Sequence, residues 1–310
     1  MRTIADVRAD FTAGRIPRET FWQEMGEHHL ALRQYHGLLE GSEIARLEIT
    51  AEALHAVTQD GLKFVWDPED YRCAPTVSVN YRAYEPAESA CLLAGCRNSK
   101  VVFDIGANIG WYAVHFIDLL RGRGGALHAF EPVPRTFAKL SANVALNGMQ
   151  DMVRLNNCGL GNKPDTLVMY VPPLSDAASL RNLHPEQDCT KVEVAIDVLD
   201  AYCRRNGVSE IDMIKCDVEG AELFVVQGGM DIIAASRPLI FLELLRKWSA
   251  PFGYHPNEVI RLLAGVGYEC WMLEGGKLVQ LREMTDDTVQ TNFFFVQPDK
   301  HAWFLNHQGA

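Results

Sequence analysis

The fold of this 310-residue chain is decided by the stretch Val101-Val102-Phe103-Asp104-Ile105-Gly106-Ala107-Asn108-Ile109-Gly110. An apolar run typical of a buried strand ends in a carboxylate, and a glycine turn then leads into a helix. The next predicted strand ends in Ala129-Phe130-Glu131-Pro132. Glu131 lies about 20 residues beyond the turn, the spacing at which an acidic residue binds a ribose, so these residues predict a nucleotide-binding β–α–β unit.

Asp104 indicates which nucleotide the unit would bind. The dinucleotide fingerprint has a glycine at this position, because backbone amides must approach a pyrophosphate. A carboxylate would repel phosphate, but it suits a ligand whose nearest groups are an ammonium and a sulfonium. S-adenosyl-L-methionine is such a ligand and is the predicted cofactor. A NAD-type dehydrogenase is the alternative enzyme, and Asp104 argues against it.

The composition narrows the class of protein. With 48% hydrophobic and 22% charged residues, the chain is typical of a globular protein, and its length allows one large α/β domain with an appendage. A formal net charge of −11 argues against a nucleic-acid partner, because such binding relies on Lys and Arg at phosphates. No apolar run is long enough to span a bilayer.

The cysteines and the start of the chain indicate the compartment. Eight cysteines occur without a C-x-x-C pair, and several lie inside apolar stretches, as free thiols in a reducing compartment do. The first residues contain no apolar signal core. The sequence therefore predicts a cytoplasmic protein. It predicts no metal site, because clustered Cys and His residues are absent.

Residues 1–60 are predicted to form a helical N-terminal appendage. One amphipathic helix begins near Pro17, and a second follows Ser42 as its N-cap. The second helix rests on apolar spacing of three and four at Ile44, Leu47, Ala51, Leu54 and Thr58. The appendage could cover the sheet edge, act as a lid over the substrate or join two subunits in a homodimer.

The rest of the chain divides into a connector and a large domain. The connector, residues 61–98, is predicted to contain short strands at 62–66 and 77–79 and a helix over 85–93. The large domain, residues 99–310, alternates strands and helices, which implies a mostly parallel sheet. Predicted strands lie at 100–105, 126–131, 152–157, 211–216, 238–244, 267–273 and 291–297, and predicted helices at 109–121, 133–147, 197–205, 219–227 and 256–265.

The last two predicted strands have no helix between them, so we expect them to pair antiparallel at one edge. An insertion at 165–196 carries a strand-like run at 167–171 and a polar loop that includes Ser179 and His184. The predicted fold is an α/β, Rossmann-like, doubly wound sheet of seven strands with an antiparallel last strand. This is the shape of a class I methyltransferase core.

The cofactor site is predicted at the carboxyl ends of the strands, where ligands bind in doubly wound sheets. Glu131 can accept hydrogen bonds from two ribose hydroxyls. Asn157 either contacts adenine or only tolerates a turn. The predicted cofactor-binding residues are Asp104, Gly106, Ala107, Asn108, Gly110, Glu131, Pro132, Asn157, Cys158 and Asp217.

A second cluster of ionisable residues follows the strand predicted at 211–216. Lys215, Asp217 and Glu219 end this strand, and three such groups at a sheet edge are costly unless they have partners or a task. Glu243 ends the next strand. Asp217 is the predicted general base, Lys215 and Glu219 would tune it, and Glu219 and Glu243 are the reserve candidates. The two acids after Lys215 could instead only stabilise a helix N-terminus.

Together these residues resemble the FkbM-type family of S-adenosylmethionine-dependent O-methyltransferases. The matching pieces are 103–110, 130–132, 159–161, 214–222 and 237–243, within a resemblance that covers roughly residues 80–297. Cys216 replaces the usual aliphatic residue, and Gly159 replaces the usual alanine. The resemblance implies methyl transfer to a hydroxyl of a small molecule, often a sugar or a natural product. A non-catalytic S-adenosylmethionine-binding scaffold is the other alternative, and the intact Lys215-Asp217-Glu219 cluster argues against it.

Overall fold

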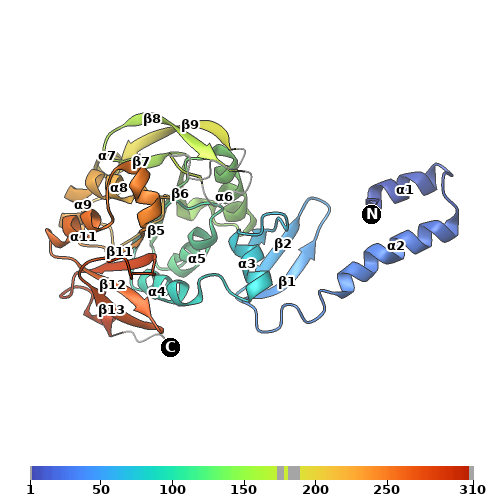
Figure 1. Cartoon of the computed structure of the whole chain (residues 1–310), viewed down its shortest axis with the longest axis horizontal. Coiled ribbons are helices and arrows are strands. Elements are labelled where there is room, and N and C mark those ends of the chain that lie inside the picture. The colour runs from blue at the N-terminus through green and yellow to red at the C-terminus, as the bar shows by residue number, and fades with distance from the viewer. Residues whose placement is uncertain (1, 173–177, 181–188, 307–310) are drawn as a thin grey trace.

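Parallel apolar strands form the centre of the structure. The computed structural model describes residues 2–172, 178–180 and 189–306 (Figure 1). Within these ranges the main sheet has eight strands in the order β13-β12-β14-β11-β10-β4-β5-β6. They are β4 Val101–Ile105, β5 Ala126–Phe130, β6 Val153–Asn156, β10 Met213–Cys216, β11 Leu239–Glu243, β12 Glu269–Glu274, β13 Lys277–Leu281 and β14 Asn292–Val296.

The strand directions confirm the predicted fold class. Strands β6, β5, β4, β10 and β11 run parallel, and β14 lies antiparallel between β11 and β12. The seven predicted strands of a class I methyltransferase core are therefore all present. Strand β13 is an additional edge strand, which forms a hairpin with β12 through Gly275 and Gly276. Both glycines have positive φ, as tight two-residue hairpin turns require.

Helices cover both faces of this sheet. The alternation along β4 shows why, since Val102 is buried in one hydrophobic core and Phe103 and Ile105 in the other. The helices predicted between the core strands are confirmed as α5, α6, α7, α8 and α11. The helices are α3 Ala74–Tyr81, α4 Pro86–Arg97, α5 Trp111–Leu120, α6 Pro134–Leu146, α7 Leu199–Asn206, α8 Glu222–Gly228, α9 Met230–Ser236, α10 Arg246–Ser249, α11 Asn257–Ala264 and α12 Ala302–Leu305, with 3-10 turns η1 Gln150–Met152 and η3 Ala250–Phe252.

The insertion contains more regular structure than the sequence predicted. Strands β7 Gly159–Gly161, β8 Asp165–Val171 and β9 Thr190–Val198 form a separate sheet in the order β7-β9-β8. The strand predicted at 167–171 is confirmed within β8. Strand β9 was missed, although its valines and isoleucine alternate with polar residues and Val194 and Ile196 are buried. His184 lies outside the described residues.

The second predicted N-terminal helix is wrong. Residues 44–58 form a hairpin of β1 Ile44–Ile49 and β2 Leu54–Thr58, which pairs further with β3 Lys63–Val65. The stretch is rich in β-branched residues, and the Thr50 hydroxyl closes the turn by donating to the carbonyl of Ala53 at 2.9 Å. Apolar spacing of three and four arose by chance across two strands.

The connector also contains one wrong prediction. The strand expected at 77–79 is part of helix α3, in which Pro75 occupies the first turn and the Ser78 hydroxyl donates to the Ala74 carbonyl at 2.8 Å. Proline favours the first turn of a helix because it lacks an N–H there. The other two predictions for the connector are confirmed by β3 and α4.

The N-terminal sheet is attached to the main domain through Asn143 of α6 and Asn147, the C-cap residue of this helix. Asn147 accepts a hydrogen bond from Lys63 N at 2.8 Å and donates to Lys63 O at 2.7 Å. Asn143 accepts from Val65 N and donates to Ile109 O in the glycine turn, each at 2.8 Å. One helix therefore ties the added sheet to the turn that decides the fold.

Residues 2–40 extend away from the rest of the molecule (Figure 1). Helices α1 Ile4–Thr12 and α2 Arg18–Arg33 pack on each other and project outward as an arm (Figure 1). The helix predicted to begin at Pro17 is α2. Trp22 and Leu30 stay 63% and 59% exposed. The arm therefore presents an apolar surface to solvent.

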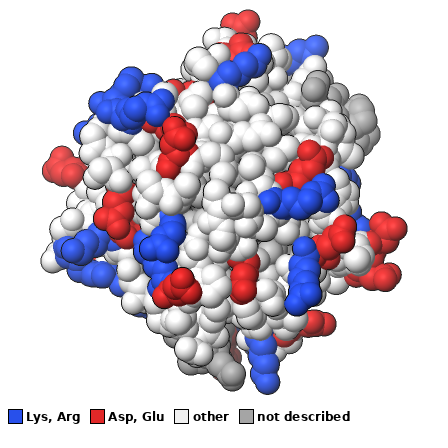
Figure 2. Space-filling view, turned by 90° about the vertical axis from the view of Figure 1, so that its left-hand side faces the viewer, with Lys and Arg blue, Asp and Glu red and all other residues white. Residues whose placement is uncertain are grey.

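The surface and the helices bear on possible partners. Figure 2 shows one face of the molecule, on which lysines and arginines lie scattered among aspartates and glutamates rather than in a broad basic area. None of the helices in the described ranges is long and apolar enough to cross a membrane. The absence of a nucleic-acid partner stays a prediction.

Candidate active site

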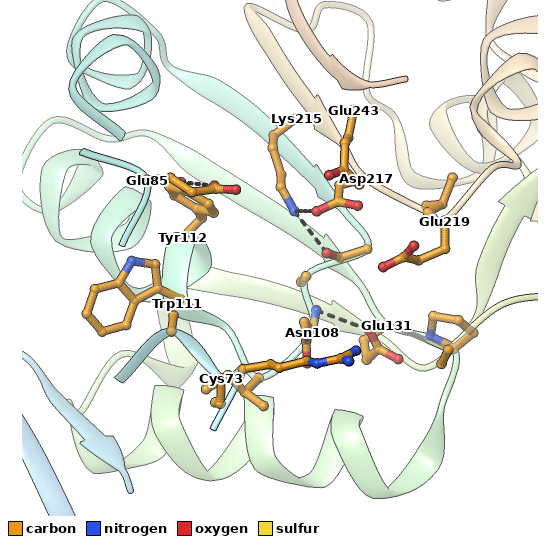
Figure 3. A pocket seen from close by; sticks show the side chains of 18 of the residues that line it. Cys73, Glu85, Asn108, Trp111, Tyr112, Glu131, Lys215, Asp217, Glu219 and Glu243 are labelled. Atoms are coloured by element: carbon orange, nitrogen blue, oxygen red, sulfur yellow. Dashed lines mark hydrogen bonds and ion pairs between the residues drawn. The ribbon is translucent and has the colours of Figure 1, made fainter. Parts of the chain in front are cut away.

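A polar pocket of about 250 Å³ lies at the carboxyl ends of the central strands, where the sequence placed the site. The turn after β4 contributes Gly106, Ala107 and Asn108, and the loop after β5 contributes Glu131 and Pro132. The carboxyl ends of β10 and β11 contribute Lys215, Asp217, Glu219 and Glu243. Figure 3 shows these acidic side chains and Lys215 arranged around one space. The structure thus brings together residues that lie more than 100 positions apart.

Gly106 has no room for a side chain. Its φ is +78°, and a Cβ atom would lie 1.8 Å from the carbonyl oxygen of Asp217. Its amide and that of Ala107 donate to Phe130 O at 3.0 and 2.9 Å. The glycine turn is therefore held between β5 and the loop after β10, and a ligand can approach its backbone closely.

Glu131 is a buried carboxylate held by backbone amides. Its two oxygens accept hydrogen bonds from Asn108 N at 3.0 Å and from Val133 N at 2.9 Å. Burial raises the pKa of Glu131 to about 7, although these two hydrogen bonds oppose the rise. Each carboxylate oxygen can accept a further hydrogen bond, so Glu131 can still bind two hydroxyls.

Asn108 provides an independent sign that a ligand fits here. It adopts the left-handed conformation with φ 49°, and it lines the pocket. Its side-chain oxygen Oδ1 is buried and has no hydrogen-bond partner among the described residues. A buried acceptor without a donor is costly, so the site suits a ligand that carries hydrogen-bond donors, as S-adenosylmethionine does.

Four predicted cofactor residues do not line the pocket. Asp104 is completely buried behind it. Gly110 lets α5 approach α6, because a Cβ atom there would lie 2.5 Å from Leu140 Cδ1. Asn157 donates to the carbonyls of Glu131 and Pro132 at 2.9 and 3.1 Å, so its amide supports the loop after β5. Cys158, which follows it, also lies outside the pocket lining.

Lys215 is a buried cation that links three parts of the site. Its Nζ donates to Gly106 O at 3.0 Å and lies 3.6 Å from Asp104 Oδ1 and 3.5 Å from Asp217 Oδ2. Burial disfavours its charge, but the attraction of the two carboxylates outweighs burial and raises the pKa of Lys215. Lys215 therefore stays charged and holds the glycine turn against the loop after β10.

Three carboxylates, one of which is the Asp217 partner of Lys215, face one another in the pocket. Asp217, Glu219 and Glu243 each place one oxygen within 4.8 Å of the others, and Figure 3 shows them converging. Burial, and then the charges of Asp217 and Glu219, raise the pKa of Glu243 to about 11. Glu243 therefore carries a proton at neutral pH, which relieves the repulsion in the cluster. The spacing could also admit a divalent cation.

Hydrogen bonds fix the loop that carries Asp217 and Glu219. Glu222 accepts hydrogen bonds from Val218 N at 3.0 Å and Gly220 N at 3.2 Å. Ser179, which the sequence placed in the polar loop of the insertion, is buried and donates to Glu219 O at 2.9 Å. Ser179 thus connects the insertion to the backbone of the acidic cluster.

The pocket also contains residues that sequence reasoning missed. Five of them come from before β4, from α5 and from after β11. They are Tyr84, Glu85, Trp111, Tyr112 and Trp248. Tyr84-Glu85 directly before Pro86, a helix-starting proline, was a visible signal for a loop end. The position of Tyr84 and Glu85 beside the glycine turn depends on the packing of α4 against α5, and the sequence pattern does not encode this packing.

Comparison with known proteins agrees with this geometry. The family model described as Methyltransferase FkbM domain matches residues 104–270, just over half of the chain. Methyltransferase sdnD of Sordaria araneosa is 30% identical over 205 residues, which cover 57% of this chain and 76% of sdnD. The 31-O-demethyl-FK506 methyltransferase FkbM of Streptomyces tacrolimicus is 27% identical, over 44% of this chain and 61% of its own length.

Two further comparisons cover parts of both chains. The 2-O-methyltransferase NoeI of Sinorhizobium fredii is 30% identical over 44% of this chain and 60% of NoeI. The chain thus spans about three fifths of the length of FkbM and NoeI. The crystal structure of methyltransferase FkbM from Methylobacillus flagellatus aligns with a TM-score of 0.40 and 17% identity, over 64% of this chain and 43% of that one. By its family match, the chain belongs to the FkbM family of S-adenosylmethionine-dependent O-methyltransferases.

Proposed function

We propose that this enzyme methylates a hydroxyl of a small molecule, such as a sugar or a natural-product intermediate. The observation that supports the proposal most directly is the single pocket that joins Glu131, the glycine turn and the acidic cluster. The names of two relatives, a 31-O-demethyl-FK506 methyltransferase and a 2-O-methyltransferase, support transfer to oxygen on small molecules. When bound, S-adenosylmethionine supplies a methyl group on a positively charged sulfur.

Glu131 would bind the ribose hydroxyls, and the glycine turn would support the middle of the cofactor. Gly106 and Ala107 line the pocket with little side chain, so backbone can contact the ligand there. The pocket carries more carboxylates than cations, which favours a cofactor of net positive charge. The Gly106 carbonyl and the carboxylates of Asp104 and Asp217 surround Lys215 beside the glycine turn. A pyrophosphate would be repelled by these groups, which argues against a NAD-type dehydrogenase.

Asp217 would orient the acceptor and remove its proton. Its side chain is 33% exposed, so an acceptor hydroxyl can reach it. The hydroxyl would donate a hydrogen bond to Asp217, and its proton would pass to that carboxylate as the oxygen takes the methyl group. Lys215 and the protonated Glu243 would hold Asp217 in place during this step. Alignment of oxygen, methyl and sulfur would supply most of the rate.

We predict that Glu131→Ala weakens binding of S-adenosylhomocysteine by about 1–3 kcal/mol, the usual loss for hydrogen bonds to a charged group. The measurement is isothermal titration calorimetry, with the exposed Glu274→Ala as a matched control. Wild-type affinity in a folded Glu131→Ala protein would remove the ribose assignment.

We predict that Asp217→Asn lowers turnover by roughly 10²–10⁴, the usual effect of losing a general base. Asparagine keeps the shape of the side chain, so cofactor affinity should change by no more than a few-fold. The assay follows labelled methyl transfer to a panel of hydroxylated metabolites, and transfer itself separates an enzyme from a non-catalytic scaffold.

Glu219→Gln and Glu243→Gln provide the comparison for that experiment. If Asp217→Asn turns over normally while one of these is inactive, the base has been assigned to the wrong carboxylate. If all three variants remain active, alignment alone carries the reaction and no side-chain base is required.

We predict that the reaction needs no metal, because the positively charged sulfur of S-adenosylmethionine is a good leaving group by itself and Asp217 can take the proton of the acceptor. Initial rates after dialysis against EDTA should equal those of the untreated enzyme. A loss of rate that added Mg²⁺ restores would contradict this and would make Asp217, Glu219 and Glu243 metal ligands.

We propose that the arm formed by residues 1–40 joins two subunits. In the described chain the pocket lining begins at Arg72, so the arm does not cover the pocket, and its exposed Trp22 and Leu30 are available to a second copy. Light scattering should show a dimer for the full chain and a monomer after deletion of residues 1–40, with unchanged S-adenosylhomocysteine binding. Equal oligomeric states would reject this role.

A further inference from the structure

Glu85 is a carboxylate in the pocket that the proposed chemistry leaves without a task. It precedes helix α4 as the N-cap residue, but its side chain makes no capping hydrogen bond. Instead, Glu85 Oε2 accepts a hydrogen bond from the Tyr112 hydroxyl at 2.8 Å. The same hydroxyl lies 3.0 Å from Ser89 Oγ. The side chain is thus directed into the pocket rather than onto its own helix.

Glu85 forms no ion pair within the described chain, although the charge of Lys215 acts on it. The ion pairs of Lys215 go to Asp104 and Asp217, and none of the other ion pairs includes Glu85. Burial raises the pKa of Glu85, while the hydrogen bond from Tyr112 and the charge of Lys215 oppose the rise. A largely buried carboxylate of this kind is stabilised by any cation that reaches it.

The position of Glu85 identifies which part of the cofactor would reach it. Figure 3 shows Glu131 and Glu85 on opposite sides of the pocket, with Glu85 beside Tyr112 and the acidic cluster along a third side. A cofactor whose ribose lies at Glu131 extends across the glycine turn, and its amino-acid end then points toward Glu85. On this side Lys215 already donates to Gly106 O, and Asp104 is completely buried.

The loop that carries Glu85 is held in an unfavourable backbone conformation. Arg82 and Glu85 have φ values of 79° and 46°, which non-glycine residues rarely adopt. The Ser42 hydroxyl donates to Arg82 O at 3.1 Å, and Tyr84 N donates to Glu43 at 2.7 Å. Residues just before strand β1 of the N-terminal sheet therefore hold this geometry, and such imposed strain is typical of ligand-binding positions.

We infer that Glu85 binds the α-ammonium group of the methionine part of S-adenosylmethionine, with Tyr112 orienting the carboxylate. The N-terminal sheet then contributes to the cofactor site through the loop it holds. The inference depends on the cofactor placement proposed above, in which the ribose lies at Glu131.

The test compares two ligands by calorimetry in wild type and Glu85→Gln. S-adenosylhomocysteine carries the ammonium group, and 5′-methylthioadenosine shares its adenosine and sulfur but lacks the amino acid. Glu85→Gln should weaken S-adenosylhomocysteine by about 10- to 100-fold, the range for one hydrogen-bonded charge pair. It should leave 5′-methylthioadenosine unchanged. Glu88→Gln, on the same helix but outside the pocket lining, should change neither ligand.

Two outcomes would overturn the inference. One is wild-type affinity of Glu85→Gln for S-adenosylhomocysteine. The other is an equal loss for both ligands, which would mean that Glu85 only shapes the pocket. Failure of wild type to bind S-adenosylhomocysteine at all would instead remove the cofactor placement itself.

A second measurement needs only the wild-type protein and so does not depend on the folding of the variant. The S-adenosylhomocysteine analogue with hydrogen in place of the amino group should bind at least about tenfold more weakly than S-adenosylhomocysteine. Equal affinities of the two ligands would show that no group of the protein recognises the ammonium.

Discussion

A buried lysine holds the active site of this protein together. Lys215 connects strand β4, the glycine turn and the loop after β10 through Asp104, Gly106 and Asp217. Without Lys215, Asp104 would be a completely buried carboxylate with no cation beside it. Breaking a buried ion pair in this way lowers the stability of a protein by about 3–5 kcal/mol. Lys215 also keeps the glycine turn close to Asp217, so the cofactor and the proposed base are placed by the same contact.

The acidic cluster shows how the fold accommodates several carboxylates in one place. Burial beside Asp217 and Glu219 raises the pKa of Glu243 to about 11. Burial raises the pKa of Glu131 only to about 7, because two backbone amides donate hydrogen bonds to it and oppose the rise. Two carboxyl groups of the same kind thus have different charge states, set by their surroundings. The more exposed Asp217 is left as the carboxylate that an acceptor can reach.

The N-terminal sheet has a structural role that reaches the site. Asn143 and Asn147 bind its backbone and the glycine turn together. Ser42 and Glu43, which lie just before β1, fix the loop before α4. The sheet therefore supports both ends of the pocket, whereas the arm before it extends away (Figure 1). A segment that matched no motif in the sequence contributes to the shape of the site.

The sequence by itself determined the doubly wound core, its antiparallel last strand, the cofactor and the acidic residues at the strand ends, because these depend on neighbours within a few positions. Apolar runs specify strands, and strand ends in a parallel sheet meet at one edge. The tertiary structure decided the hairpin at 44–58, the supporting positions of Asp104, Gly110 and Asn157, and the presence of Glu85 in the pocket. Each of these depends on which distant segments pack together, and that contact leaves no local pattern in the sequence.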